Sequence, residues 1–217
     1  MCIVVIAGGP NKDLSTILPK ISSAERIICA DSGADSLHSA GILPDMVWGD
    51  MDSISRDTLS WLKENNVANR VFPVEKDMTD SELCLRSLEK STPVLFVTSL
   101  VGRTDHVVTN LLLVMRLQTE GYDITVTDGH SWVFPLCGNR SFEIPSELVS
   151  AENVCSLIPL GEGAFGVSAF GMKYPLAENN IICGSSFTVS NEFDLEKEKH
   201  GFVMRNGTML VMIVPRS

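Results

Sequence analysis

Two carboxylates one residue apart, within Trp48-Gly49-Asp50-Met51-Asp52-Ser53, are the first residues of this chain whose spacing suggests chemistry. On an extended backbone, alternate side chains point the same way, so Asp50 and Asp52 would converge if the segment stays extended. Such carboxylates repel each other unless a cation lies between them or one binds a proton. Mg²⁺ is the expected cation, because it prefers oxygen ligands and is often shared with substrate phosphates. The alternative is an acidic turn that binds no metal.

Further polar residues share one property with this pair, which is that each group follows a predicted strand. The groups are Asp31 after residues 26–30, Asp50 and Asp52 after 46–48, Asp77 and Asp80 after 70–74, and Gly102, Arg103, Asp105 and His106 after 94–98. In a parallel sheet these positions all lie at the carboxyl edge, where open α/β sheets bind ligands. Carboxylates that hold metal ions, together with an arginine, are what phosphoryl transfer requires. The sequence therefore predicts a Mg²⁺–polyphosphate site.

Each of these residues also has a purely structural interpretation. Asp80 could favour a helix dipole, Asp105 could be a helix N-cap, and Asp31 could belong to a simple turn. His106 could only form hydrogen bonds at a helix start. The loops at Gly8-Gly9 and Gly102-Arg103 are the candidates for holding a phosphate with backbone N–H groups. The shared position of the acidic residues after strands favours the functional interpretation.

The first part of the chain alternates short apolar runs with helical patterns. Strands are expected at 2–7, 26–30, 46–48, 70–74, 94–98 and 123–127, and helices at 34–40, 55–65, 79–90 and 105–120. Ser55 and Thr79 are the expected helix caps, and the helix at 105–120 is apolar enough to predict burial. The alternation predicts a Rossmann-like α/β domain, with a mostly parallel sheet and helices on both faces.

The pattern changes near residues 129–145, after which short strand-like runs replace helical ones. These runs lie at 154–158, 165–170, 187–189, 201–205 and 209–214 and are separated by Gly, Asn, Ser and Pro. Such spacing is typical of an antiparallel sandwich or barrel. The second part is therefore expected to be all-β.

Composition and charge exclude several classes of protein. The formal net charge is −10, with 17 Lys plus Arg against 27 Asp plus Glu, which argues against nucleic-acid and anionic-membrane partners. No apolar stretch approaches the roughly 20 residues of a membrane span. The six cysteines show no CxxC pair or zinc-like spacing and are expected to be reduced. We expect a cytoplasmic protein without nucleic-acid or membrane partners.

Six short blocks, in order along most of the chain, resemble the thiamin pyrophosphokinase family. They are Ala30-Asp31-Ser32-Gly33-Ala34-Asp35, Gly41-Ile42-Leu43-Pro44-Asp45, Gly49-Asp50-Met51-Asp52-Ser53, Lys76-Asp77-Met78-Thr79-Asp80, Gly102-Arg103-Thr104-Asp105-His106 with Asn110, and Val189-Ser190-Asn191-Glu192. The resemblance implies pyrophosphoryl transfer from ATP to the hydroxyl of thiamin, giving thiamin diphosphate and AMP. It also implies a homodimer, with an α/β domain over 1–130 that binds ATP and Mg²⁺. A β-sandwich over 131–217 would bind thiamin and form the dimer.

Site residues follow from the same resemblance, block by block. Mg²⁺ would lie at Asp50, Asp52 and Asp77, with Asp80 and Asp105 as further catalytic residues. The ATP and phosphate site would contain Asp31, Ser32, Gly33, Ser53, Gly102, Arg103 and His106, and thiamin would contact Ser190 and Asn191. The chain departs from the family at Val101, which stands where a glycine is usual. The aromatic residue that stacks on thiamin is open among Phe187, Phe193, Phe202 and Trp132.

Two other functions compete with this interpretation. A nucleotide-sugar glycosyltransferase also uses an Asp-x-Asp turn, but it would need only Asp50 and Asp52 and would leave the other acidic residues without a role. A non-catalytic domain that senses a nucleotide or thiamin diphosphate would be expected to lack some metal ligands, whereas every expected carboxylate is present. The nucleotide products distinguish these possibilities, because AMP is released only by pyrophosphoryl transfer.

Overall fold

The fold is that of a computed structural model of the chain, which describes residues 2–10, 13–71 and 77–216. The contacts between residues divide the chain into two compact units. The first contains Met1–Leu113 and Glu120–His130, and the second contains Val114–Thr119 and Ser131–Ser217. We describe each unit separately.

A parallel sheet forms the centre of the first unit. Its strand order is β4 (Ala68–Val71), β3 (Met46–Gly49), β2 (Arg26–Ala30), β1 (Ile3–Ala7), β5 (Pro93–Val97) and β6 (Asp123–Thr127). Every neighbouring pair in this order is parallel, as the alternating pattern predicted. The side chains of Val4, Val5 and Ile6 in the central strand β1 are completely buried. Of the strand predicted at 70–74, residues 72–74 lie outside the described residues.

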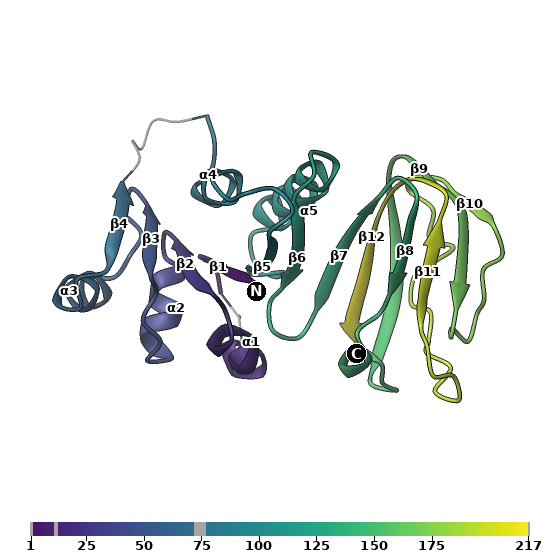
Figure 1. The fold of residues 1–217 in the computed structure, drawn as a ribbon, viewed down its shortest axis with the longest axis horizontal. Helices are drawn as coiled ribbons and strands as arrows, with labels where there is room; N and C mark the ends of the chain where they lie inside the picture. Colours follow the sequence, from purple (N-terminus) through teal and green to yellow (C-terminus); the bar gives the residue numbers. More distant parts are fainter. Residues whose placement is uncertain (1, 11–12, 72–76, 217) are drawn as a thin grey trace. The chain divides into compact units, whose positions relative to one another are not determined.

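Helices connect the strands and cover both faces of this sheet. They are α1 (Leu18–Ser22), preceded by a 3-10 turn at Leu14–Ile17, α2 (Gly33–Ser39), α3 (Arg56–Glu64), α4 (Asp80–Arg86) and α5 (Thr104–Thr119). Figure 1 shows α1 and α2 on one side of the sheet and α4 and α5 on the other. Ser55 and Thr79 cap α3 and α4 as predicted, accepting hydrogen bonds from the N–H groups of Thr58 and Glu82. The prediction missed α1.

The predicted burial of the helix at 105–120 is wrong for one face. Val114 and Leu117 of α5 are completely buried, but Val108 and Leu112 are 49% and 52% exposed. The apolar composition of the helix did not distinguish the face that packs against the protein from the face that the chain leaves uncovered. Helix α4 ends at Arg86, four residues before the predicted end at 90.

The second unit consists mainly of antiparallel strands: β7 (Trp132–Cys137), β8 (Arg140–Glu143), β9 (Asn153–Phe170), β10 (Asn179–Ile181), β11 (Gly201–Met204) and β12 (Asn206–Pro215). Strand β12 pairs with β7 and β9, while the end of β9 pairs with β11, and β11 pairs with β8. Phe134 of β7 contacts Phe142 of β8, with ring centroids 4.9 Å apart. This strand-rich region agrees with the predicted change of pattern.

Three details of the second unit differ from the prediction. The runs at 154–158 and 165–170 belong to one continuous strand, β9, and the strands β7, β8 and β10 were not predicted. Residues 187–189 form a turn instead of a strand, since Phe187 and Val189 are exposed and Thr188 is held by bonds to the backbone of Leu157. An alternating apolar run alone does not show whether a neighbouring strand is available for pairing.

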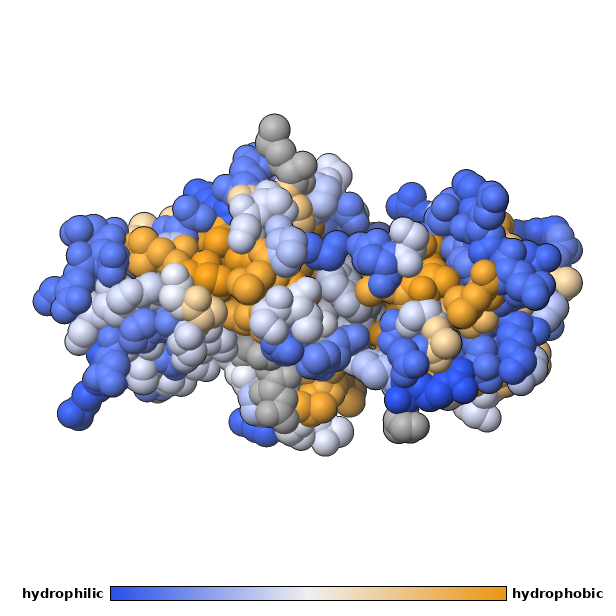
Figure 2. All heavy atoms as spheres, turned by 90° about the horizontal axis from the view of Figure 1, so that it is seen from below, coloured by the Kyte–Doolittle hydropathy of each residue, from blue (hydrophilic) through white to orange (hydrophobic). Residues whose placement is uncertain are grey.

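The surface exposes hydrophobic as well as hydrophilic residues, and the cysteines form no disulfide among the described residues. Figure 2 shows one face of the molecule, on which hydrophobic residues gather into patches between hydrophilic ones. All six cysteines belong to the described residues, and each is a free thiol. Among the described residues, no helix is both long and apolar enough to cross a membrane.

Candidate functional site

Three carboxylates meet at the carboxyl edge of the parallel sheet. Asp31 directly follows β2, and Asp50 and Asp52 follow the neighbouring strand β3. One carboxylate oxygen from each residue lies within 4.8 Å of the other two. The prediction that the acidic residues after strands share one edge is therefore confirmed for these three. The sequence did not place Asp31 in the same cluster as the Asp50–Asp52 pair, because that depends on β2 and β3 being neighbours.

The backbone brings these carboxylates together by turning, not by staying extended. Met51, between the two acidic residues, has φ of 68°, and the preceding Gly49 has φ of 141°. Asp31 also lies in the left-handed region, with φ of 51°, and its N–H donates a hydrogen bond of 2.7 Å to the carbonyl of Trp48. The expectation that an extended segment aligns Asp50 and Asp52 is wrong, although the two side chains do converge.

Electrostatics within the cluster favour the binding of a cation. The pKa of Asp52 is raised, first because its carboxyl shares a hydrogen bond with Asp50, and then because of the charge on Asp50, partial desolvation, and the charges of Asp31 and Asp80. The Oδ1 atom of Asp31 is buried and accepts no hydrogen bond from the described residues. Its other oxygen accepts a hydrogen bond from the hydroxyl of Ser53. A buried carboxylate oxygen without a partner is costly unless a cation or donor binds there.

The remaining predicted acidic residues on this edge differ in their distance from the cluster. Asp80, in the first turn of α4, points toward β3, since a Cβ atom added to Gly49 would lie 3.4 Å from the Oδ1 atom of Asp80. Asp77 is exposed and does not belong to the carboxylate cluster of the described residues. Lys76, from the same sequence block, lies outside the described residues.

A cavity of about 840 Å³ opens beside the cluster. The predicted site residues that line it are Asp31, Ser32, Ser53, Asp80, Gly102, Arg103, Asp105 and His106. The volume falls within the range of small-molecule and cofactor sites. Thr98 and Ser99 also line the cavity but were not predicted, although their position directly after β5 could have indicated them. Asn110 lines the cavity too and donates a hydrogen bond of 3.1 Å to the hydroxyl of Thr98.

Arg103 is held in place at the mouth of this cavity by Asp105. Its guanidinium donates two hydrogen bonds to the Asp105 carboxylate, of 2.6 and 3.2 Å. The bonds from Arg103 lower the pKa of Asp105 to about 2, so this carboxylate is ionised at neutral pH. Both side chains are more than 60% exposed, which leaves the guanidinium accessible to a phosphate group. Asp105 belongs to the first turn of α5, and His106 beside it is exposed.

Val101 fits the loop because the left-handed position falls on its neighbour. Gly102 has φ of 89°, whereas Val101 does not have a positive φ. The Ser99 hydroxyl donates to the carbonyl of Val101 at 2.7 Å and accepts from its N–H at 3.3 Å, forming a compact turn. The departure from the family pattern at Val101 therefore imposes no backbone strain.

Gly33 has a packing role that the sequence did not reveal. A Cβ atom at this position would lie 2.0 Å from the carbonyl oxygen of Ile6 in β1. The absence of a side chain thus lets α2 begin directly against β1, two residues after Asp31. The predicted contact of Gly33 with ATP stays a prediction.

The predicted thiamin residues lie in the second unit. Ser190 is exposed at φ of 61°, and its N–H donates to the hydroxyl of Ser156 at 2.9 Å. The side chain of Asn191 holds the neighbouring segment, with bonds to the N–H and carbonyl of Tyr174 of 3.1 and 2.7 Å. Among the four aromatic candidates, Phe202, Phe193 and Trp132 are buried, whereas Phe187 is 66% exposed.

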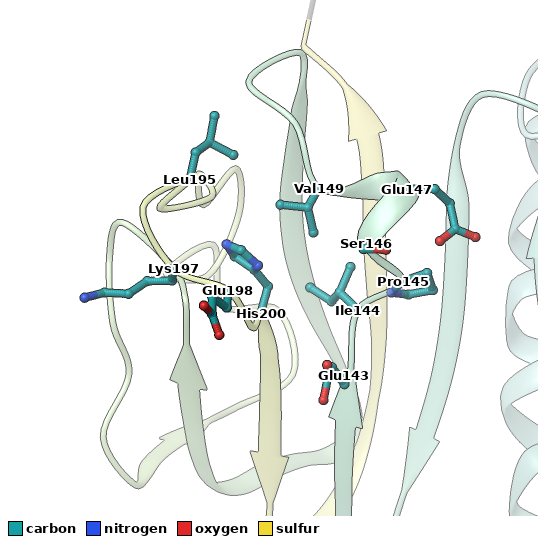
Figure 3. Close-up of a pocket in the computed structure, with 10 residues that line it drawn as sticks. All are labelled: Glu143, Ile144, Pro145, Ser146, Glu147, Val149, Leu195, Lys197, Glu198 and His200. Carbon is teal, nitrogen blue, oxygen red and sulfur yellow. The ribbon is translucent and has the colours of Figure 1, made fainter.

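A second cavity, of about 650 Å³, lies within the second unit. Figure 3 shows its lining from two segments, Glu143, Ile144, Pro145, Ser146, Glu147 and Val149 on one side and Leu195, Lys197, Glu198 and His200 on the other. Ile144 and His200 are joined by a backbone hydrogen bond of 2.8 Å. None of the predicted site residues lines this cavity, whereas eight of them line the first.

Comparisons with known proteins agree with this geometry. The sequence matches the thiamin pyrophosphokinase catalytic domain over residues 19–126 and the thiamin pyrophosphokinase vitamin B1 binding domain over residues 141–208. It is 30% identical to the thiamine pyrophosphokinase of Bacillus subtilis, over 88% of each chain. It is 26% identical to thiamine pyrophosphokinase 1 of Arabidopsis thaliana, over 86% of this chain and 78% of the plant protein.

The fold also resembles a solved structure of this family. The crystal structure of thiamin pyrophosphokinase from Geobacillus thermodenitrificans superimposes with a TM-score of 0.81 at 26% identity, covering 100% of this chain and 99% of the other. The two family matches together span most of the sequence, and the first includes the carboxylate cluster. The chain therefore belongs to the thiamin pyrophosphokinase family.

Proposed function

We propose that this enzyme transfers the pyrophosphoryl group of ATP to the hydroxyl of thiamin and releases AMP. The observation that carries the proposal is the carboxylate cluster of Asp31, Asp50 and Asp52 beside a cavity that also presents Arg103. In this reaction the thiamin hydroxyl oxygen bonds to the β-phosphorus of ATP. The bond between the β-phosphorus and the oxygen that bridges it to the α-phosphorus breaks. AMP leaves with that oxygen, and the hydroxyl proton of thiamin is released.

Mg²⁺ suits the carboxylate cluster. The orphaned Oδ1 atom of Asp31 and the repulsion between the carboxylates of Asp50 and Asp52, which raises the pKa of Asp52, are both features that a hard cation would relieve. We propose Asp31, Asp50 and Asp52 as its ligands, with Asp77 and Asp80 at or near the same site. Bound Mg²⁺ would neutralise charge on the phosphate oxygens during transfer.

Side chains around the first cavity would bind and orient the triphosphate. Asp105 accepts hydrogen bonds from Nε and Nη2 of Arg103 and keeps the guanidinium oriented, and the N–H groups that Asp105 does not occupy would donate to phosphate oxygens. Gly8, Gly9 and Gly102 line the same cavity, and their backbone N–H groups would donate to phosphate oxygens. Ser32, Ser53 and His106 would complete the phosphate site.

Thiamin recognition is proposed for the second part of the chain. We assign residues 1–130 to an α/β catalytic domain and 131–217 to a β-sandwich that contacts thiamin, which the ranges of the two family matches support. Ser190 would contact thiamin directly, because its side chain is exposed, and Asn191 would hold the turn through its bonds to Tyr174. Phe187 is the most exposed aromatic candidate for stacking.

We also propose that the enzyme is a cytoplasmic homodimer. The free cysteines suit a reducing compartment. Four apolar side chains of the second unit, Tyr174, Ile182, Phe187 and Val189, are 48–66% exposed, and we propose that the dimer interface covers them. Light scattering at micromolar concentration should give twice the 23.7 kDa mass of one chain. A mass of 23.7 kDa across the concentration range would contradict the dimer.

The reaction itself is tested by incubating the purified protein with ATP, Mg²⁺ and thiamin and separating the products. AMP and thiamin diphosphate should accumulate in equal amounts. ADP with thiamin monophosphate would show transfer of one phosphate and contradict the proposal. ATP binding without any thiamin-dependent turnover would favour the sensing domain, and the glycosyltransferase alternative finds no support in the family matches.

A further inference from the structure

We propose that Asp35, outside the cavity, is a positioning residue that fixes the loop carrying Asp50 and Asp52. This inference rests on the proposed metal-binding role of that loop. The loop connects β3 to α3 and contains residues 50–55. Its left-handed turn at Met51 provides no regular secondary structure to hold the two carboxylates. Within the loop, the N–H of Asp52 donates to the carboxylate of Asp50 at 3.2 Å, and side-chain contacts at the end of the loop fix where this turn lies.

Two serine–aspartate contacts join this loop to the start of α2. Ser53 donates from its hydroxyl to the carboxylate of Asp31. Two residues later, Ser55 donates to Asp35 from both its hydroxyl, at 2.7 Å, and its N–H, at 3.2 Å. Ser53 and Asp31 line the first cavity, whereas Ser55 and Asp35 do not. Asp31 and Asp35 lie at the two ends of one short segment, so the second contact sets where the loop lies relative to Asp31.

Ser55, which makes the second contact, is also connected through Thr58 to the residues that pack α2 against α3. A carboxylate only accepts, so the Ser55 hydroxyl must donate to Asp35, and its oxygen accepts the N–H of Thr58 at 3.3 Å. The hydroxyl of Thr58 is buried and lies 2.9 Å from Nδ1 of His38, in α2. The ring of His38 stacks on Trp61 of α3, with centroids 4.6 Å apart.

This arrangement makes Asp35 a rigid support for the cluster. Its hydrogen bonds are charge-assisted, which makes them stronger than bonds between neutral groups. The same serine caps α3, so the loop ends at a fixed point on a packed helix. Groups that orient metal ligands without touching the metal typically change metal affinity or activity by roughly 10–100-fold when they are mutated.

Asp35→Asn tests the inference, because asparagine keeps the size of the side chain but removes its charge. Mn²⁺, which suits the same carboxylate ligands, serves as the probe, and the free ion is counted by electron paramagnetic resonance. We expect the dissociation constant for Mn²⁺ to rise roughly 10–100-fold. Hydrogen exchange at residues 50–55 should become faster, while the KM for thiamin stays unchanged. Asp57→Asn is the matched control, because Asp57 is an exposed acidic residue in the first turn of α3.

A conservative pair of variants separates positioning from general destabilisation. Ser55→Thr keeps both the hydroxyl and the helix cap and should behave as wild type. Ser55→Gly removes the hydroxyl and lowers the stability of the helix cap by only a few tenths of a kcal/mol. It should reduce Mn²⁺ affinity as much as Asp35→Asn does. The double variant should lose no more affinity than either single variant, because both remove the same contact. Normal Mn²⁺ affinity and normal exchange in Asp35→Asn would overturn the inference.

The two proposals fail in distinguishable ways. If Asp50→Asn also binds Mn²⁺ as wild type does, the metal site assigned to this loop is wrong. Hydrogen exchange at residues 50–55 still decides whether Asp35 positions the loop, because that measurement requires neither metal nor turnover. Unchanged exchange in Asp35→Asn then rejects the positioning role whatever the metal result.

Discussion

Asp50→Asn should lower the rate of thiamin diphosphate formation on the order of 100-fold or more, because it removes a proposed ligand of the metal that neutralises the phosphates. The amide retains one oxygen but loses the charge that Mg²⁺ binds most strongly. Asp50 lies half-buried at the carboxyl edge of the sheet, close to two other carboxylates. Removing its charge relieves repulsion within the cluster, so the melting temperature should not fall.

The measurement for Asp50 combines three readouts. AMP release is followed at increasing Mg²⁺, the melting temperature is recorded by circular dichroism, and Mn²⁺ binding is measured without substrates. The expected combination is a lower rate and weaker metal binding at an unchanged melting temperature. Asp57→Asn provides the control for loss of one nearby acidic charge. A wild-type rate in Asp50→Asn would remove Asp50 from the metal site.

Gly33→Ala should destabilise the protein by about 3 kcal/mol or more, which is the upper range for overpacking a closely packed site. The added Cβ would lie 2.0 Å from the Ile6 carbonyl oxygen, and backbone atoms on both sides cannot move away independently. The start of α2 would have to shift away from β1 and would carry Asp31 with it. Both stability and activity should therefore decrease, with a melting temperature lower by roughly 5–10 °C.

Gly41→Ala is the comparison for this effect. Gly41 has φ of 68°, and a Cβ there would meet no atom within 4 Å, so only backbone strain of about 1 kcal/mol is expected. Gly41 also lies beyond the far end of α2 from the cluster, so AMP release should stay near the wild-type rate. Urea unfolding of the two variants measures the difference. Equal stability losses would show that the contact between Gly33 and β1 is looser than the distance indicates.

The position of a site residue was predictable from the sequence where the residues next to it mark the end of a strand or the start of a helix. The carboxyl end of each parallel strand is marked locally, because an apolar run ends and an acidic residue follows, as at Asp31 and Asp50. Parallel pairing then places such residues on one edge. Caps behave in the same way, and Ser55 was identified correctly because a cap bonds to a residue only three positions later.

What the tertiary structure decided depends on which distant segments become neighbours. Asp31 lies close to Asp50 and Asp52 because β2 pairs with β3 and because the backbone makes a left-handed turn at Met51. No local sequence pattern encodes either feature. Likewise, the apolar character of residues 187–189 and of α5 could not show that the first lacks a strand partner and the second leaves one face exposed. Local patterns thus determined the types of most elements of the parallel sheet and the order of the functional residues. The contacts that bring carboxylates together, and the bond from Asp35 that holds their loop, exist only after residues far apart in sequence have packed.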